Sequence, residues 1–116
     1  MRVELATQED VYGAWSGPSA PPHVRETTFP DGCLYRLERG SGSDYLLAYG
    51  ERAVFHLDSG ARLVRSAPAR PRDPAWQRFL LDTVLATASL VRGFEMLHAS
   101  AVGRGSGCVA FLAGMG

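Results

Sequence analysis

The chain of 116 residues is long enough for one small domain, or for a small module and the start of a second. Its 46% apolar and 21% charged residues are typical of a globular fold and exclude an intrinsically disordered chain. Twelve acidic residues balance twelve basic ones, and every basic residue is an arginine. This balance gives no electrostatic reason to expect a nucleic acid or a membrane surface as a partner, and we predict neither.

Residues 1–66 predict a small antiparallel sheet. Polar and apolar side chains alternate in residues 2–6 and 33–38, and turn residues such as those of Pro30-Asp31-Gly32 separate the short runs. Residues 16–22 contain three prolines, which have no place in a central strand, so we expect a loop there. The expected strands are residues 2–6, 26–29, 33–38, 45–49, 53–57 and 61–66.

Residues 67–72 are rich in proline and arginine and predict a linker to a second part, residues 73–116. The hydrophobic period then changes to steps of three and four, which predicts a helix over residues 74–92. Asp73 suits the N-cap, Pro74 suits the first helical position and Gly93 suits the stop. Because apolar residues cover most of its surface, we expect this long helix to be largely buried.

The end of the chain predicts a β-hairpin that leads into a glycine-rich loop. Residues 108–112 form an apolar run, and a turn at 103–107 joins them to an earlier strand. A phosphate-binding loop follows a buried strand and reads Gly or Ala, four residues, then Gly-Lys-Ser/Thr. The first four positions of that pattern are matched here by Ala113, Gly114, Met115 and Gly116.

The remaining part of the loop pattern, Gly-Lys-Ser/Thr, is missing from this sequence. Backbone N–H groups from Gly114 to Gly116 can converge on phosphate oxygens, because no Cβ obstructs the two glycines. However, the chain has no lysine to reach a β- or γ-phosphate, and arginine replaces that compact charge poorly. We therefore expect phosphate binding by these 116 residues to be weak at best.

Residues 80–116 resemble the HPr kinase/phosphorylase-like P-loop family. The likeness is carried by residues 97–102 (LHASAV), the short glycine hairpin and residues 108–114 (CVAFLAG). Residues 1–70 share only a general likeness to the β-rich N-terminal region of such proteins. The resemblance implies an ATP-dependent serine kinase that acts on a protein or peptide, with ATP and Mg²⁺ as cofactors of the complete family protein. It also implies that His98 lies beside the transferred phosphate.

This sequence departs from the family where catalysis needs it most. The loop lysine, the Mg²⁺-binding Ser/Thr and the downstream acidic residues have no counterpart. We therefore expect this chain alone to be inactive and to bind no cofactor. We also expect it to be the N-terminal part of a longer kinase-like protein, because an end directly after a buried strand would leave one strand face uncovered.

Two other classes of function stay open. One is a non-catalytic module that binds a peptide or protein along its exposed strand edges, and the other is a shortened paralogue that has lost catalysis. The phosphate acceptor and the oligomeric state are not indicated by the sequence. In either case we expect an α+β fold, in which a small antiparallel β region and one long buried helix precede a β-hairpin and an incomplete P-loop.

For several histidines and cysteines, a purely structural role is an alternative to a functional one. His98 lies in an apolar run, where a histidine is often a core residue with satisfied ring nitrogens. His56 lies close in sequence to Asp58, but no nucleophile with a recognisable context accompanies them, so we expect no separate hydrolase site. We expect Cys33 and Cys108 to be buried free thiols and, with the scattered histidines, to make no metal site.

The chain shows no sign of export or membrane insertion. Its first residues lack the continuous apolar core of a signal peptide. The most apolar stretch, residues 79–91, is too short for a span and contains Asp82. We therefore predict a cytoplasmic protein.

Overall fold

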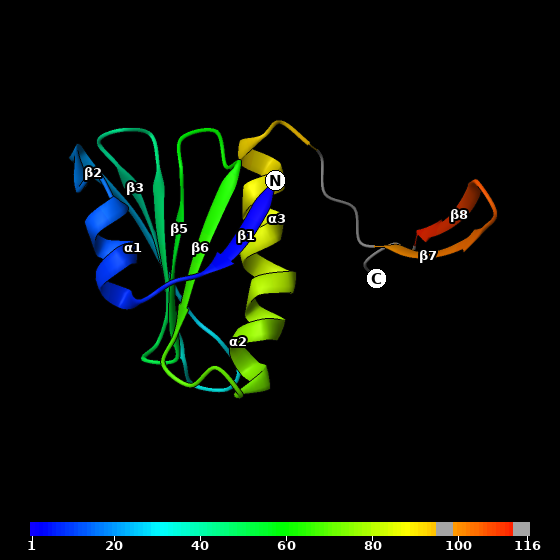
Figure 1. Cartoon of the computed structure of the whole chain (residues 1–116), viewed down its shortest axis with the longest axis horizontal. Coiled ribbons are helices and arrows are strands. Elements are labelled where there is room, and N and C mark those ends of the chain that lie inside the picture. Colours follow the sequence, from blue (N-terminus) through cyan, green and yellow to red (C-terminus); the bar gives the residue numbers. More distant parts are fainter. Residues whose placement is uncertain (95–98, 113–116) are drawn as a thin grey trace.

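The computed structural model describes residues 1–94 and 99–112. The fold is mixed α+β, with a six-stranded sheet, a helix of 18 residues and a two-stranded hairpin (Figure 1). The expected fold class is therefore confirmed at this level. None of the helices in the described residues is long and apolar enough to cross a membrane.

The six-stranded sheet has the order β1-β6-β5-β4-β3-β2. Neighbouring strands are antiparallel except β1 and β6, which are parallel, so the expectation of a purely antiparallel sheet was wrong at that edge. Parallel pairing arises because the chain leaves β1 and crosses to the far edge before β2 begins. The strands are β1 (Arg2–Leu5), β2 (Pro18–Thr28), β3 (Leu34–Gly40), β4 (Tyr45–Tyr49), β5 (Ala53–Leu57) and β6 (Leu63–Pro68).

Strand β2 corrects the loop expected over residues 16–22. It begins at Pro18 and lies at the edge of the sheet, where a missing proline N–H leaves no ladder hydrogen bond unmade. Its pairing with β3 shifts register between Pro18 and His23 and is regular from His23 to Thr28. The prolines of residues 16–22 therefore lie in an edge strand whose pairing with β3 is irregular before His23. At the other end of the sheet, β6 extends to Pro68 and takes the first two residues of the expected linker.

The crossing from β1 to β2 contains a short helix that was not expected, α1 (Gln8–Ala14). A capping box starts it, because the Asp10 amide donates to the Thr7 hydroxyl at 3.1 Å and the Thr7 amide donates to the Asp10 carboxylate at 3.2 Å. Val11 is its one buried residue. A single buried position makes no periodic apolar stripe in the sequence. Only the capping pattern of Thr7 and Asp10 could therefore have predicted this helix.

The long helix begins at Pro74 and ends at Val91, close to the expected bounds. The Asp73 carboxylate accepts from the Ala75 amide at 3.0 Å, and Gly93 follows with a φ of +87°, as expected for these caps. A π-helical turn, η1 (Leu80–Val84), separates α2 (Pro74–Phe79) from α3 (Leu85–Val91).

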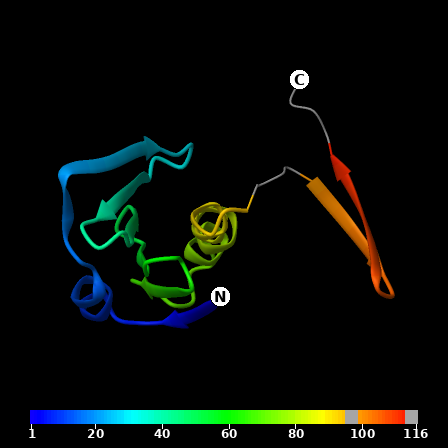
Figure 2. The ribbon, with the colours of Figure 1, turned by 90° about the horizontal axis from the view of Figure 1, so that it is seen from above.

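Only one stripe of this helix is buried. Leu81 and Leu90 are 65% and 58% exposed, so the expectation of a largely buried helix was wrong. The reason is that the helix has sheet on one side only, and Figure 2 shows the sheet curving around it. The buried side chains along the stripe are Trp76, Phe79, Val84 and Ala88.

The main core lies between this helix and the sheet. Phe79 contacts four aromatic rings, and its ring stacks on Tyr49 with centroids 4.4 Å apart. A smaller apolar cluster on the opposite face packs Val11 of α1 against Leu46, Val54 and Ala67. The two faces of the sheet are therefore covered by the long helix and by α1, respectively.

The hairpin of β7 (Ala99–Arg104) and β8 (Gly107–Leu112) confirms the two strands expected near the end of the chain. Figure 1 shows it as a separate two-stranded sheet. Cys108 on β8 is exposed and Cys33 is half-buried, and both are free thiols. The prediction of free thiols is confirmed, whereas the prediction that both are buried was wrong.

Candidate functional site

The residues expected to contact phosphate lie outside the described part of the chain. His98 directly precedes β7, and Ala113, Gly114, Met115 and Gly116 directly follow β8. The structure does describe the hairpin between them. Its last pair is Ala99 with Leu112, so the segments that begin with His98 and Ala113 leave the hairpin at the same end. This shared end is the candidate phosphate site.

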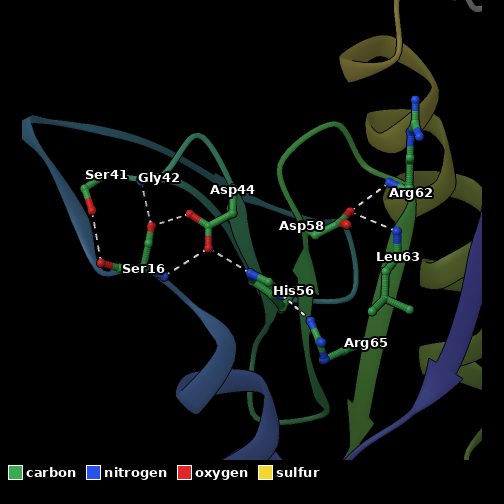
Figure 3. Close-up of polar contacts among 9 residues, drawn as sticks. All are labelled: Ser16, Ser41, Gly42, Asp44, His56, Asp58, Arg62, Leu63 and Arg65. Carbon is green, nitrogen blue, oxygen red and sulfur yellow. Dashed lines mark hydrogen bonds and ion pairs between the residues drawn. The ribbon is translucent and has the colours of Figure 1, made fainter.

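A second group of polar residues, which the sequence did not indicate, lies on the α1 face of the sheet (Figure 3). Asp44, just before β4, is 5% exposed and His56 on β5 is 2% exposed. The His56 Nε2 atom lies 2.8 Å from Asp44 Oδ2, and its Nδ1 atom lies 3.2 Å from an Arg65 guanidinium nitrogen. Arg65 in turn lies 3.6 Å from Glu4 on β1.

Asp44 also holds the loop that joins α1 to β2. Its carboxylate accepts from the Ser16 hydroxyl, and the Ser16 amide donates to it at 2.9 Å. The Ser16 hydroxyl itself accepts from the Gly42 amide at 2.8 Å. One carboxylate therefore joins three segments that are far apart in sequence.

Hydrogen-bonding roles in this network are fixed by arginine. A guanidinium can only donate, so His56 Nδ1 accepts from Arg65 and the ring proton lies on Nε2, where it is donated to Asp44. Both ring nitrogens are thereby used. His56 has no free lone pair with which to act as a general base, and it does not contact Ser16, so the three residues do not form a catalytic triad.

The charge on Asp44 is stabilised by the same contacts. Burial acts to raise the pKa of the Asp44 carboxyl, but hydrogen bonds from the Ser16 hydroxyl, His56 and the Ser16 amide outweigh burial, so its pKa lies below the usual value. Asp44 is therefore an ionised acceptor at neutral pH. Its arrangement supports a structural role for the network.

The network also requires a glycine at the end of β3. A Cβ added to Gly40 would overlap the Asp44 carboxylate and the Ser16 hydroxyl and would lie 2.9 Å from Trp15 Nε1. Gly40 therefore serves the close approach of the backbone to a buried carboxylate.

Asp58 is not the partner of His56. Its carboxylate accepts from the Arg62 amide at 2.7 Å and from the Leu63 amide at 2.9 Å, which closes the turn before β6 (Figure 3). Alternation along β5 turns the His56 ring toward the α1 face, where Asp44 lies.

A cavity of about 410 Å³ lies at one end of the main core. Asp31 at its rim accepts a hydrogen bond from the Tyr49 hydroxyl, which lowers the pKa of Asp31 and, together with burial, raises the pKa of Tyr49 to about 12. Tyr49 is therefore a neutral phenol at physiological pH. Hydrogen bonding to each other thus engages Asp31 and Tyr49, whereas a second carboxylate of the lining, Asp82, is exposed. Its lining residues are Phe29, Asp31, Tyr49, Arg52, Ala75, Arg78, Phe79, Asp82 and Thr83.

The described residues contain no group of three or more His, Cys, Asp or Glu side chains that could hold a metal ion. Comparison with known proteins adds no family to this description. No family model matches the chain, and no curated protein or solved structure matches it either.

Proposed function

We propose that the segment after β8 opens the phosphate-binding loop of an ATP-dependent serine kinase of the HPr kinase-like type, which acts on a protein or peptide. One observation carries the proposal: an apolar strand, β8, ends at Leu112 and is followed directly by Ala-Gly-Met-Gly. A strand that ends in a glycine-rich turn is the usual start of a site for a nucleotide phosphate.

His98 belongs to the same proposal. The hairpin pairs Ala99 with Leu112, and these residues are the sequence neighbours of His98 and of the loop segment, respectively. A histidine beside the phosphates can donate a hydrogen bond to the transferred group. In the family that the sequence resembles, the loop lysine and Mg²⁺ neutralise the charge on the transferred phosphate, and neither the lysine nor the Mg²⁺-binding Ser/Thr is among these 116 residues.

The test uses the protein expressed from the complete reading frame. We expect it to bind ATP in the presence of Mg²⁺ and to transfer phosphate to a serine. Gly116→Val should abolish ATP binding, because a branched side chain would occupy the space of the phosphate oxygens. His98→Ala should retain ATP binding and lower kcat at least tenfold. Unchanged binding by Gly116→Val would contradict the proposal.

A second candidate function is a non-catalytic module that binds a peptide. The observation in its favour is β2, an eleven-residue strand at the edge of the sheet in which nearly every side chain is exposed. An exposed sheet edge can accept an extended peptide as a further strand. Nucleotide-independent binding of a peptide by the 116-residue chain would support this function.

A further inference from the structure

A groove of about 440 Å³ runs beside the open edge of β2. Its walls come from three adjacent strands, β2, β3 and β4. A groove of this size is comparable to sites that hold small molecules or a few side chains of a peptide. The residues that line it are Pro22, His23, Val24, Arg25, Leu37, Arg39 and Tyr45.

Strand register shows which face of the sheet the groove occupies. His23, Arg39 and Tyr45 are paired across the three strands, and Arg25 is paired with Leu37 in the next row. Leu37 and Tyr45 pack against the main core, so these rows lie on the face covered by the long helix. No helix residue lines the groove. It therefore occupies the part of this face near the β2 edge that the helix leaves open.

Charge distinguishes the groove from the rest of this sheet. Its lining contains two arginines and a histidine but no carboxylate. On the opposite face, Arg36 lies 2.9 Å from Glu26 and 3.4 Å from Glu38. By contrast, within residues 1–94 and 99–112 neither Arg25 nor Arg39 has a carboxylate partner within 4.0 Å.

We propose that this groove binds an extended peptide with acidic side chains, which adds to the sheet beside β2. The inference deepens the second candidate function and rests on it, and it does not depend on the phosphate loop. The observation behind it is the juxtaposition of an apolar floor, an open strand edge and two guanidinium groups, Arg25 and Arg39, that have no carboxylate partner among the described residues, although Arg39 also lies 3.4 Å from the Ser43 hydroxyl.

The geometry of strand addition explains why these features belong together. Side chains directly opposite on neighbouring strands lie about 5 Å apart, and alternate residues of an added strand point to the same face. Residues of the peptide that face the groove would therefore lie next to His23 and Arg25. Arginine pairs with a carboxylate through two parallel hydrogen bonds, which gives both affinity and orientation. Arg39, one strand further in, can reach the same groups with its long side chain.

Fluorescence anisotropy with the 116-residue chain and a labelled peptide of alternating Glu and Val provides the test. We expect this peptide to bind at least tenfold more tightly than the same peptide with Gln in place of Glu, and we expect added salt to weaken its binding. The double variant Arg25→Gln, Arg39→Gln should lose at least tenfold in affinity. The control, Arg62→Gln with Arg92→Gln, removes the same charge from exposed positions outside the groove and should bind as the unmodified chain does.

Three results would overturn the inference. They are equal binding of the Glu and Gln peptides, unchanged binding by the folded Arg25, Arg39 double variant, and displacement of the peptide by inorganic phosphate at a concentration similar to the peptide's Kd. The last result would assign the groove to a small anion. N-methylation of alternate peptide amides separates strand addition from side-chain contact alone, because it should abolish binding only in the first case. Nucleotide appears in none of these assays, so their failure leaves the kinase proposal untouched.

Discussion

The sheet face under the long helix buries an aromatic cluster around Phe79, whereas the face under α1 buries a chain of hydrogen-bonded polar side chains around Asp44. Apolar packing tolerates small shifts at the cost of area and cavities. A buried carboxylate tolerates no loss of a partner, because the unpaired group remains in a dry environment. One face is thus held by aromatic and aliphatic packing, whereas the other combines a smaller apolar cluster with a buried hydrogen-bond network.

Truncation of Phe79 should break the aromatic face and cause the largest loss. Its ring contacts Phe29, Tyr35, Tyr49 and Phe55, so Phe79→Ala leaves a cavity among them. We expect the free energy of unfolding, measured in urea, to fall by about 3–5 kcal/mol. Leu81→Ala removes an exposed side chain of the same helix and should change it by less than about 0.5 kcal/mol. Similar losses in the two variants would contradict the assignment of the buried stripe.

A single methyl group at Gly40 should disrupt the polar face. The Cβ of Gly40→Ala would occupy the position of the Asp44 carboxylate and the Ser16 hydroxyl. We expect a loss of about 2–3 kcal/mol in the same urea experiment, because the overlap forces the buried contacts apart. Gly13 lies in α1 with open space around it, so Gly13→Ala should stabilise the chain by about 0.5–1 kcal/mol. A neutral Gly40→Ala variant would show that the network is not tightly held.

Acid should weaken the polar face selectively. The pKa of Asp44 is lowered in the folded state, so its contribution to stability is present above its unfolded pKa and is lost as the pH falls through the folded pKa. Asp44→Asn places an amide donor against the donors that face Asp44 and should cost about 1–3 kcal/mol at pH 7. The difference in free energy of unfolding between the unmodified chain and Asp44→Asn should narrow as the pH is lowered from 5 toward 2. A gap that is constant with pH would mean that Asp44 is not held as a carboxylate.

Two serines on opposite faces should respond in opposite ways to the same change. The Ser66 hydroxyl is buried and has no hydrogen-bond partner among the described residues, so Ser66→Ala should leave the chain unchanged or stabilise it by up to about 0.5 kcal/mol. Ser16→Ala removes a donor to Asp44 and should cost about 1–2 kcal/mol. Thermal unfolding of the two variants side by side gives the comparison. Destabilisation by Ser66→Ala would indicate a partner for that hydroxyl.

Sequence patterns were most informative where local chemistry decides the structure. The cap formed by Asp73 and Pro74, the bounds of the long helix and the strands β4 and β5 follow from local preferences and were predicted. The parallel pairing of β1 with β6 depends on a crossover over the whole sheet, which no local pattern contains.

The buried polar network was not predictable for a similar reason. Asp44 and His56 meet because β4 and β5 are neighbours and because alternation turns both side chains to one face. Asp58, two positions from His56 in sequence, is instead used by its own turn. The candidate phosphate site differs in this respect. It was proposed from a local sequence motif, the glycine-rich residues that follow β8, and not from side chains that the fold brings together.

The most direct test of the kinase proposal is to read the codons that follow Gly116 in the gene. The proposal predicts one further residue, then Gly-Lys-Ser or Gly-Lys-Thr, and then a helical pattern. A stop codon, or a frame without that lysine, would contradict the kinase proposal and leave peptide binding at the β2 edge as the function to pursue.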